Sequence, residues 1–238
     1  MIPLVVAMAC DGGKSDDGSA TENPTSDDVV AVSPASRADS ASSASSTSPK
    51  VTVLFFGTSL TAGYGLDPAV AFPRLVAEQA AADGLPIEAI NAGLSGETSA
   101  GAVRRIDWTL KTPVDVVILE TGGNDALRAL NADSLENNIR ALVGRVQRAQ
   151  PDAKILLAVM EAPPNLGASY TRRFREAYAK VAREKAVSLL PFLLEGVAGH
   201  PELSQADGVH PNERGERVVA ANVWKALKPV VEGVADDR

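Results

Sequence analysis

Short, continuous runs of apolar residues alternate along the chain with longer stretches in which apolar residues recur every three or four positions. The short runs are typical of strands covered on both faces, and the longer stretches are typical of helices with one buried face. Strands are expected at residues 51–56, 87–91, 114–120, 154–160 and 187–190. Helices are expected at residues 72–82, 97–111, 135–146, 174–182 and 219–230.

The regular alternation of strands and helices indicates an α/β protein. Strands joined by helices of this length lie parallel, and the helices cover both faces of the sheet. The sequence therefore predicts a three-layer α/β/α domain with a five-stranded parallel sheet. In open sheets of this kind, ligands bind beyond the carboxyl ends of the strands, near the point where the strand order reverses. Reactive residues should consequently follow the strands directly.

The first 49 residues differ in composition from the rest of the chain. Residues 1–10, MIPLVVAMAC, resemble the end of a bacterial signal peptide, and Cys10 stands where lipoproteins carry their lipidated cysteine. The alternatives are an ordinary cleaved signal or a disordered tip with an unused thiol. Residues 11–49 are rich in Ser, Asp, Ala, Thr and Pro and contain no aromatic residue, which predicts a disordered linker.

The folded domain is expected at residues 50–231, followed by a flexible tail at residues 232–238. As a flexible tether, residues 11–49 would span about 35 Å. This organisation predicts a periplasmic or secreted protein, held at a membrane if Cys10 is lipidated.

Composition argues against several classes of protein. The formal net charge is −7, whereas a nucleic-acid-binding surface needs clustered basic residues. A single cysteine rules out an intrachain disulfide and a metal site built on several thiolates. The two histidines are not accompanied by a carboxylate cluster, so no metal site is expected. No apolar run reaches the length of about eighteen residues that a transmembrane helix needs. We expect the protein to be a monomer.

Four polar segments that contain glycine occupy the positions where chemistry is expected. Three come directly after strands and contain, in order, Ser59, Gly93 and Asn124. The fourth lies shortly before the last helix and contains Asp207 and His210, three positions apart. A serine hydroxyl needs a base and an oxyanion site to act as a nucleophile, and the base needs an acidic partner. Each segment alone also has a simple structural explanation, as a helix cap or a loop turn.

His200 is a second candidate for the base. It lacks an acidic residue three positions upstream, because Val197 occupies that position. His200 is therefore interpreted as a surface loop residue, and His210 is preferred.

Taken together, the four segments resemble the sequence blocks of SGNH hydrolases, also called the GDSL family. The segments are GTSLTAGYGL, NAGLSGETS, GGND and DGVHPN. The resemblance runs from residue 50 to about residue 229 and is closest to single-domain bacterial arylesterases, acyl-thioesterases and lysophospholipases. It implies a flavodoxin-like SGNH hydrolase fold. The order of the segments, and the absence of a Gly-x-Ser-x-Gly elbow, separate the chain from the α/β-hydrolases.

The resemblance also implies a role for each site residue. Ser59 would be the nucleophile, His210 the base and then the acid, and Asp207 the partner that holds His210. The oxyanion would be stabilised by the backbone N–H groups of Ser59 and Gly93 and by the side-chain amide of Asn124. No metal or organic cofactor is required.

One residue departs from the family pattern. Thr58 stands before the serine, where an aspartate is usual. That aspartate is not a member of the triad, so we expect the reaction class to be retained, whereas the rate and the specificity are left open.

These residues predict a serine esterase that hydrolyses short- to medium-chain acyl esters through an acyl-enzyme, as an arylesterase, thioesterase or lysophospholipase. By resemblance, Leu127, Leu130 and Leu166 belong to loops that bind the acyl chain; the alternative is that they only close the edge of the domain. The rival functions are a carbohydrate acetyl esterase with the same triad and a non-catalytic binding or scaffold protein anchored at an envelope.

Overall fold

Five parallel strands form the centre of the structure, a computed structural model in which residues 50–238 are described. The strands are β1 (Val51–Gly57), β2 (Ile87–Gly93), β3 (Val116–Leu119), β4 (Lys154–Ala158) and β5 (Ser188–Leu190). They lie in the order β2-β1-β3-β4-β5, and all neighbours are parallel. The predicted α/β class and five-stranded parallel sheet are confirmed.

Burial is greatest in the central strands. Val53, Phe55 and Val116 have no exposed surface, and all four residues of β3 are buried. A central strand of a parallel sheet is covered by helices on both faces, and this explains why the apolar runs in the sequence are continuous. The edge strand β2 is buried only at Ile87 and is half-buried or exposed elsewhere.

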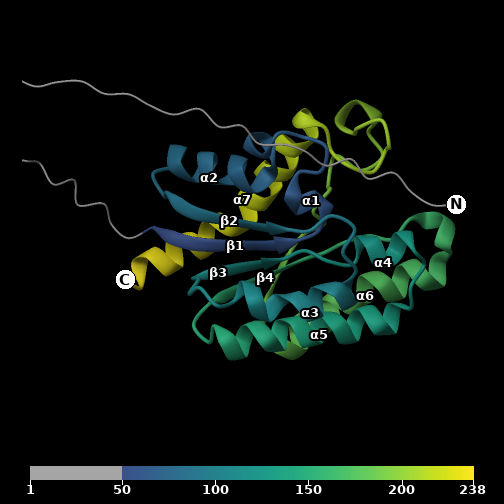
Figure 1. Ribbon diagram of the computed structural model, residues 1–238, viewed down its shortest axis with the longest axis horizontal. Helices are drawn as coiled ribbons and strands as arrows, with labels where there is room; N and C mark the ends of the chain where they lie inside the picture. The colour runs from purple at the N-terminus through teal and green to yellow at the C-terminus, as the bar shows by residue number, and fades with distance from the viewer. Residues whose placement is uncertain (1–49) are drawn as a thin grey trace, which may run out of the picture. The chain divides into compact units, whose positions relative to one another are not determined.

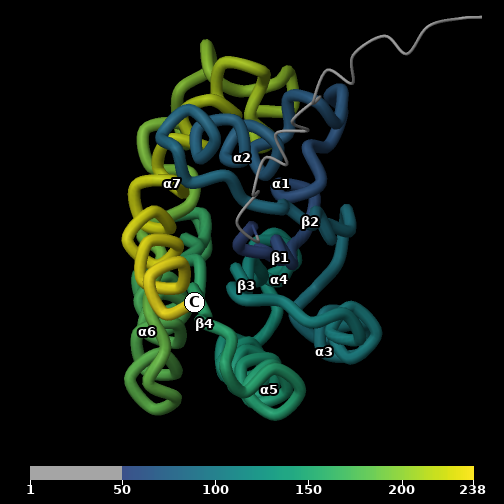
Figure 2. The backbone as a smooth tube through the Cα atoms, turned by 90° about the vertical axis from the view of Figure 1, so that its left-hand side faces the viewer, coloured from purple at the N-terminus to yellow at the C-terminus, as the bar shows by residue number. Residues whose placement is uncertain are grey.

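The helices form one layer on each face of the sheet (Figure 1, Figure 2). On one face, α2 (Phe72–Ala82) packs against α7 (Glu213–Asp236). The other layer contains α3 (Ser99–Thr109), α5 (Ala132–Ala149) and α6 (Ala168–Lys185). Two short helices, α1 (Ser59–Ala62) and α4 (Gly123–Leu127), follow β1 and β3. The 3₁₀ turns are η1 (Pro68–Val70), η2 (Pro164–Leu166) and η3 (Pro201–Leu203).

The amphipathic spacing that predicted α5 is reproduced in its packing. The helix begins after Asn131, whose side-chain oxygen accepts the backbone N–H groups of Asp133 and Ser134. A cap of this kind satisfies two of the N–H groups that the first turn leaves free. The apolar residues of the predicted stripe are all buried: Leu135, Ile139, Leu142, Val143 and Val146.

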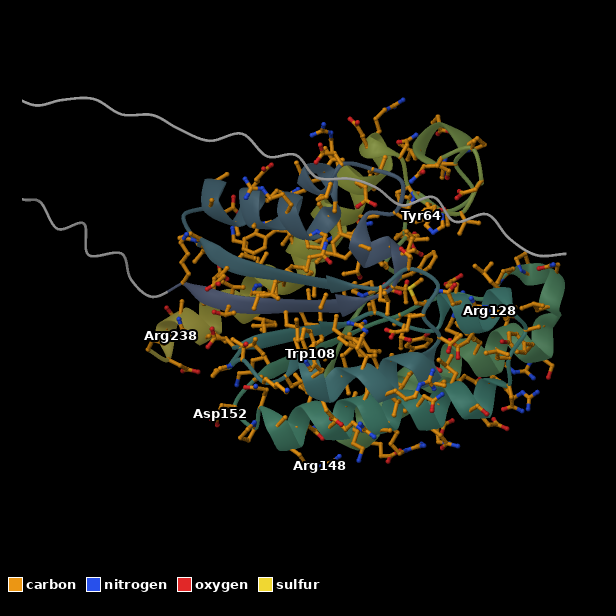
Figure 3. All side chains as sticks on the ribbon, viewed as in Figure 1. Tyr64, Trp108, Arg128, Arg148, Asp152 and Arg238 are labelled. Atoms are coloured by element: carbon orange, nitrogen blue, oxygen red, sulfur yellow. The ribbon has the colours of Figure 1, made fainter. Side chains whose placement is uncertain are left out.

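The strand order reverses at β1, which lies between β2 and β3. The chain leaves β1 toward β2 on one side and leaves β3 toward β4 on the other, so the loops that follow the carboxyl ends of the neighbouring strands β1 and β3 diverge. Figure 3 shows Tyr64 and Arg128, which follow β1 and β3, at this edge of the sheet. Asp152 and Arg238 lie at the opposite edge.

The last helix is longer than expected. Because α7 continues to Asp236, the predicted flexible tail at residues 232–238 is helical over most of its length, and that prediction is wrong. Arg238 then donates to the carbonyl oxygen of Lys50 at 3.0 Å and to the carboxylate of Asp115 at 2.5 Å. Within residues 50–238, no helix combines the length and apolarity needed to span a bilayer. The predicted signal segment and linker, residues 1–10 and 11–49, lie outside the described residues.

Candidate active site

The predicted nucleophile lies in the turn between β1 and the short helix α1. Ser59 is the first residue of α1 and has 9% of its surface exposed. Gly57 has to be glycine, because an added Cβ would lie 2.0 Å from Oγ1 of Thr61 and 2.5 Å from Oε2 of Glu120. The helix ends at Gly63, whose φ of 69° favours glycine. The glycines on either side of Ser59 thus permit the tight turn that presents its hydroxyl at the edge of the sheet.

The structure brings Ser59, His210 and Asp207 into one chain of hydrogen bonds. Nε2 of His210 lies 2.9 Å from Oγ of Ser59, although the two residues are 151 positions apart. Nδ1 of His210 lies 2.7 Å from Oδ2 of Asp207. The other carboxylate oxygen of Asp207 accepts the backbone N–H groups of Val209 and His210, at 2.9 and 3.0 Å. This is the geometry that a serine, its base and an orienting carboxylate require.

The electrostatics of Asp207 determine the tautomer of the imidazole. Hydrogen bonds from the backbone N–H of His210, from its ring and from the backbone N–H of Val209 lower the pKa of Asp207 to about 2. At neutral pH the carboxylate is therefore ionised and can only accept hydrogen bonds. Nδ1 of His210 must then be the donor, which leaves Nε2 free to accept the proton of the Ser59 hydroxyl.

Tyr64 and Gln205 support the base and its loop from outside the triad. The ring of Tyr64 packs against that of His210, with centroids 4.7 Å apart. Nε2 of Gln205 donates to the carbonyl oxygens of Tyr64 and Pro211, at 2.7 and 2.9 Å. The backbone N–H of Gln205 also donates to the carbonyl oxygen of His210 at 2.7 Å. Gln205 therefore ties the loop after α1 to the loop that carries the base.

Asn124 lies on α4 and lines the same cavity as Ser59. The following residue, Asp125, is buried and anchors α4 to the start of α3. Its carboxylate accepts the backbone N–H of Ser99 at 2.8 Å and the Ser99 hydroxyl at 2.5 Å. Before α4, Gly122 has a φ of 104°, and an added Cβ there would lie 2.2 Å from the Tyr178 hydroxyl. The turn that presents the Asn124 amide is thus fixed at both sides.

The structure does not place Gly93 where the predicted oxyanion role would require it. Its backbone N–H donates to Oδ1 of Asn91 at 2.9 Å, and Gly93 does not line the cavity. Gly93 ends β2, where an added Cβ would lie 2.3 Å from the backbone nitrogen of Ala62, so it serves close packing against α1. Gly96, three positions further along in the loop that follows β2, does line the cavity and has a φ of 77°.

Thr58 has a hydrogen-bond partner, Glu120, that was not predicted from the sequence. Its backbone N–H donates to Oε2 of Glu120 at 2.6 Å, and its hydroxyl donates to both carboxylate oxygens at 3.0 Å. The hydroxyl of Thr61 donates to the same carboxyl group at 3.0 Å. Burial raises the pKa of Glu120, and these hydrogen bonds oppose the rise. The buried carboxyl group of Glu120, directly after β3, therefore binds the turn that carries the nucleophile. In the sequence, the only sign of this role is an acidic residue at the end of a continuous apolar run.

A cavity of about 780 Å³ opens beside the triad and is lined by Ser59, Asn124 and His210. Away from these polar groups its wall is mainly apolar and comes from α4 and from the loops after β4 and β5. Its apolar lining includes Leu127, Met160, Pro163, Phe192, Leu194 and Val197. A cavity of this size with a few polar groups at one end suits a small ligand with an apolar part.

The three leucines predicted to bind an acyl chain have different positions. Leu127 lines the cavity and is 57% exposed. Leu130 and Leu166 do not line it, so the structure gathers only one of the three leucines at the cavity. The carbonyl oxygen of Leu130 accepts the hydroxyl of Tyr170 at 2.7 Å, which ties that loop to α6.

The remaining predictions concern residues away from the cavity. His200 is an exposed loop residue whose Nδ1 lies 3.2 Å from Oε1 of Glu202, as its interpretation as a surface residue requires. Within the described part of the chain, no three His, Cys, Asp or Glu side chains are grouped to hold a metal ion. Cys10 lies outside the described residues.

Comparisons with known proteins agree with this geometry. The family model described as "GDSL-like Lipase/Acylhydrolase family" matches residues 55–218. The chain is 36% identical over 182 residues to "Esterase TesA" of Pseudomonas aeruginosa, covering 76% of this chain and 89% of the relative. It is 35% identical over 181 residues to "Thioesterase 1/protease 1/lysophospholipase L1" of Escherichia coli, covering 76% of this chain and 85% of the relative.

A solved structure gives the same result. The psychrotrophic esterase EstA from Pseudoalteromonas sp. superposes with a TM-score of 0.72 at 31% identity, covering 76% of this chain and 98% of the esterase. Fold, site geometry and sequence therefore agree, and the chain belongs to the GDSL-like lipase/acylhydrolase family, the SGNH hydrolases, as a GDSL-type esterase.

Proposed function

We propose that the protein hydrolyses short- to medium-chain acyl esters through an acyl-enzyme formed on Ser59. The observation that carries this proposal is the unbroken chain of hydrogen bonds from Asp207 through His210 to the Ser59 hydroxyl, 2.7 and 2.9 Å long. A serine outside such a chain is a poor nucleophile at neutral pH.

In the first step, Oγ of Ser59 attacks the carbonyl carbon of the ester while its proton passes to Nε2 of His210. The oxyanion of the tetrahedral intermediate is stabilised by the backbone N–H groups of Ser59 and Gly96 and by the side-chain amide of Asn124. When the intermediate collapses, the bond to the leaving oxygen or sulfur breaks and His210 returns the proton to the leaving group. Water then attacks the acyl-enzyme with the same base, releasing the carboxylic acid and the free serine.

The substrate preference follows from the shape of the cavity. Each methylene group moved from water into an apolar wall contributes about 0.8 kcal/mol, so binding should improve with acyl length until the cavity is filled. Relatives named as a thioesterase and lysophospholipase and as an arylesterase support acyl substrates with different leaving groups. Leu127 and Met160, which follow the neighbouring strands β3 and β4, are the side chains we expect to contact the acyl chain.

A panel of p-nitrophenyl esters from acetate to hexadecanoate, with matching acyl-CoA thioesters and lysophospholipids, tests the proposal. We expect kcat/KM to rise from acetate, to peak between butanoate and decanoate, and to vanish in Ser59→Ala. Acetylated xylan serves as the competing substrate. A preference for acetylated xylan over the longer esters would instead favour a carbohydrate acetyl esterase, and hydrolysis that survives in Ser59→Ala would remove the triad mechanism.

We also infer from the sequence that Cys10 is lipidated and that residues 11–49 tether the domain at a membrane of the envelope. Metabolic labelling with an alkyne-bearing fatty acid should mark the protein expressed in a bacterial host and should be lost in Cys10→Ser. Equal labelling of both proteins would contradict this inference.

A further inference from the structure

One side chain, Arg105 of α3, contacts three separate segments at the carboxyl edge of the sheet. Nη1 donates to the carbonyl oxygen of Ala92 at 3.0 Å, and Nη2 donates to the carbonyl oxygen of Gly57 at 3.3 Å. Nε and Nη2 also donate to the carboxylate of Glu97, at 2.9 and 2.6 Å. A single guanidinium group therefore joins the ends of β1 and β2 to the turn that follows β2.

The guanidinium group is held in one orientation. Its Cζ lies 4.1 Å from the centre of the ring of Phe56, a buried residue of β1, and this cation–π contact fixes the plane of the group. The carboxylate of Glu97 accepts hydrogen bonds from two of its nitrogens. The side chain of Arg105 is only 22% exposed and that of Glu97 only 5%. Such a bidentate pair is strong and directional, and lysine cannot reproduce it because its ammonium group is a point charge.

The segments joined by Arg105 are those that supply the backbone donors to the oxyanion. Gly57 stands two residues before Ser59, and Glu97 directly follows Gly96. Neither Arg105 nor Glu97 lines the cavity, so neither touches a substrate there. Any effect on catalysis must therefore pass through the segments that they hold.

We infer that the Arg105–Glu97 pair is a positioning pair that sets the spacing between the N–H groups of Ser59 and Gly96. The inference rests on the proposed function, in which both N–H groups bind the oxyanion. The spacing matters most when negative charge develops on the substrate oxygen, so losing it should lower kcat much more than it changes KM. Misplacement of a reacting group by about 1 Å can lower a rate by about 10²-fold.

Two variants test this role, Arg105→Lys and Glu97→Gln, with Arg104→Lys as the matched control. Arg104 is the exposed neighbour on the same helix and has no place in the site. Each protein is first titrated to completion with a fluorophosphonate, which counts the molecules with a reactive serine. The turnover of p-nitrophenyl butanoate is then expressed per titrated site, so that partial unfolding lowers the count and leaves the turnover of the remaining sites unchanged.

We expect kcat per titrated site to fall about 10- to 100-fold in both test variants, with KM within about threefold of wild type, an unchanged pH profile and a normal Arg104→Lys control. If Arg105→Lys does not fold, Glu97→Gln decides alone, because it leaves the guanidinium group and its contacts to the two strands in place. A kcat per titrated site within about twofold of wild type would overturn the positioning role. Ser59→Ala separates the two ideas: activity in that variant removes the proposed function, whereas an inactive Ser59→Ala beside normal test variants removes only the positioning pair.

Discussion

The nucleophile and the oxyanion donors are positioned by side chains from distant parts of the sequence, whereas the carboxylate that orients the base acts within one turn. Glu120 binds Thr58 and Thr61, which are 62 and 59 positions away, and is 1% exposed. Asp207, in contrast, binds only within residues 207–210, and its side chain is 40% exposed.

This difference determines what each half of the site depends on. The nucleophile half of the site comprises Ser59 and the segments that Glu120 and Arg105 hold. Its buried hydrogen bonds also hold strands and helices together, so its geometry is coupled to the stability of the fold. The base half comprises Asp207 and His210. It uses a local turn that costs little to order and is open to solvent. Substitutions in the nucleophile half should therefore change both stability and turnover, and those in the base half should change turnover almost alone.

The largest effect is expected for Asp207→Asn in the base half. An asparagine can present its own N–H to the imidazole and so favour the wrong tautomer of His210, which should lower kcat by about 10⁴-fold. The melting temperature, followed by circular dichroism, should change by only a few degrees, because exposed side chains contribute little to stability. A kcat within about tenfold of wild type would show that Asp207 does not orient the base.

The next largest effect is expected for Asn124→Ala, which removes one donor to the oxyanion. The value of kcat should fall by about 10²–10³-fold with little change in KM. Asn137→Ala, at an exposed position of α5, is the control and should behave as wild type. Steady-state kinetics with p-nitrophenyl butanoate measures both; near-native turnover in Asn124→Ala would remove this side chain from the oxyanion site.

A smaller effect on turnover, but a larger one on stability, is expected for Glu120→Ala. Thr58 and Thr61 would lose a buried acceptor, and unpaired buried donors cost about 1–3 kcal/mol each. We expect a loss of about 2–4 kcal/mol in the free energy of unfolding, measured in urea, and a fall in kcat of about 10- to 100-fold.

Thr58→Val gives the comparison for that experiment. It keeps the bond from the backbone N–H of residue 58 to Glu120 and loses only the hydroxyl bond, so it should cost about 1 kcal/mol. If Glu120→Ala lowered kcat without lowering stability, the coupling of the nucleophile half to the fold would be wrong.

The smallest effect on activity is expected for Glu216→Gln, at the start of α7. Burial raises the pKa of Glu216 to about 7 from an ordinary value of 4.5, and a hydrogen bond from the backbone N–H of Phe72 opposes the rise. The folded protein then binds more protons than the unfolded chain between these two values. Its stability therefore falls as pH rises from about 4.5 to about 7 and stays lower above that range.

Glu216→Gln should remove this pH dependence and stabilise the protein by about 1–3 kcal/mol at pH 8, with little gain at pH 4. Glu213→Gln, exposed on the same turn, is the control. Urea unfolding at the two pH values measures the difference, and an equal effect at both would contradict the raised pKa. Turnover should be unaffected, because Glu216 does not line the cavity.

The fold was predictable because each element depends on a local pattern. The continuous apolar run at residues 51–56 and the stripe of α5 leave few ways to bury their apolar surface. Asp207 and His210 were also predictable, since a carboxylate and a base three positions apart around a glycine form a turn without help from the rest of the chain. Their meeting with Ser59 follows from the rule that sites lie at the carboxyl edge.

The residues that were missed, or that lie elsewhere than predicted, depend on contacts between distant segments. Gly93 ends β2 and Gly96 lies in the loop that follows, and only the register of β2 against β1, together with the side chain of Asn91, decides which glycine lines the cavity. In the sequence, Glu120 and Arg105 cannot be distinguished from ordinary charged residues, because their partners lie in other segments that only the folded sheet places beside them. Sequence patterns cannot specify such contacts because they carry no information on the register of distant elements.

The central claim is that the distant supports and the local turn converge on a single hydroxyl. Rapid quenching of the protein with p-nitrophenyl butanoate, followed by peptide mass spectrometry, tests it directly. The triad predicts a butanoyl adduct on Ser59 alone, formed in a burst and lost with hydrolysis, and accumulating little in His210→Ala. A butanoyl adduct on another residue would contradict the assignment of Ser59 as the nucleophile. Turnover at the wild-type rate in Ser59→Ala would contradict it as well.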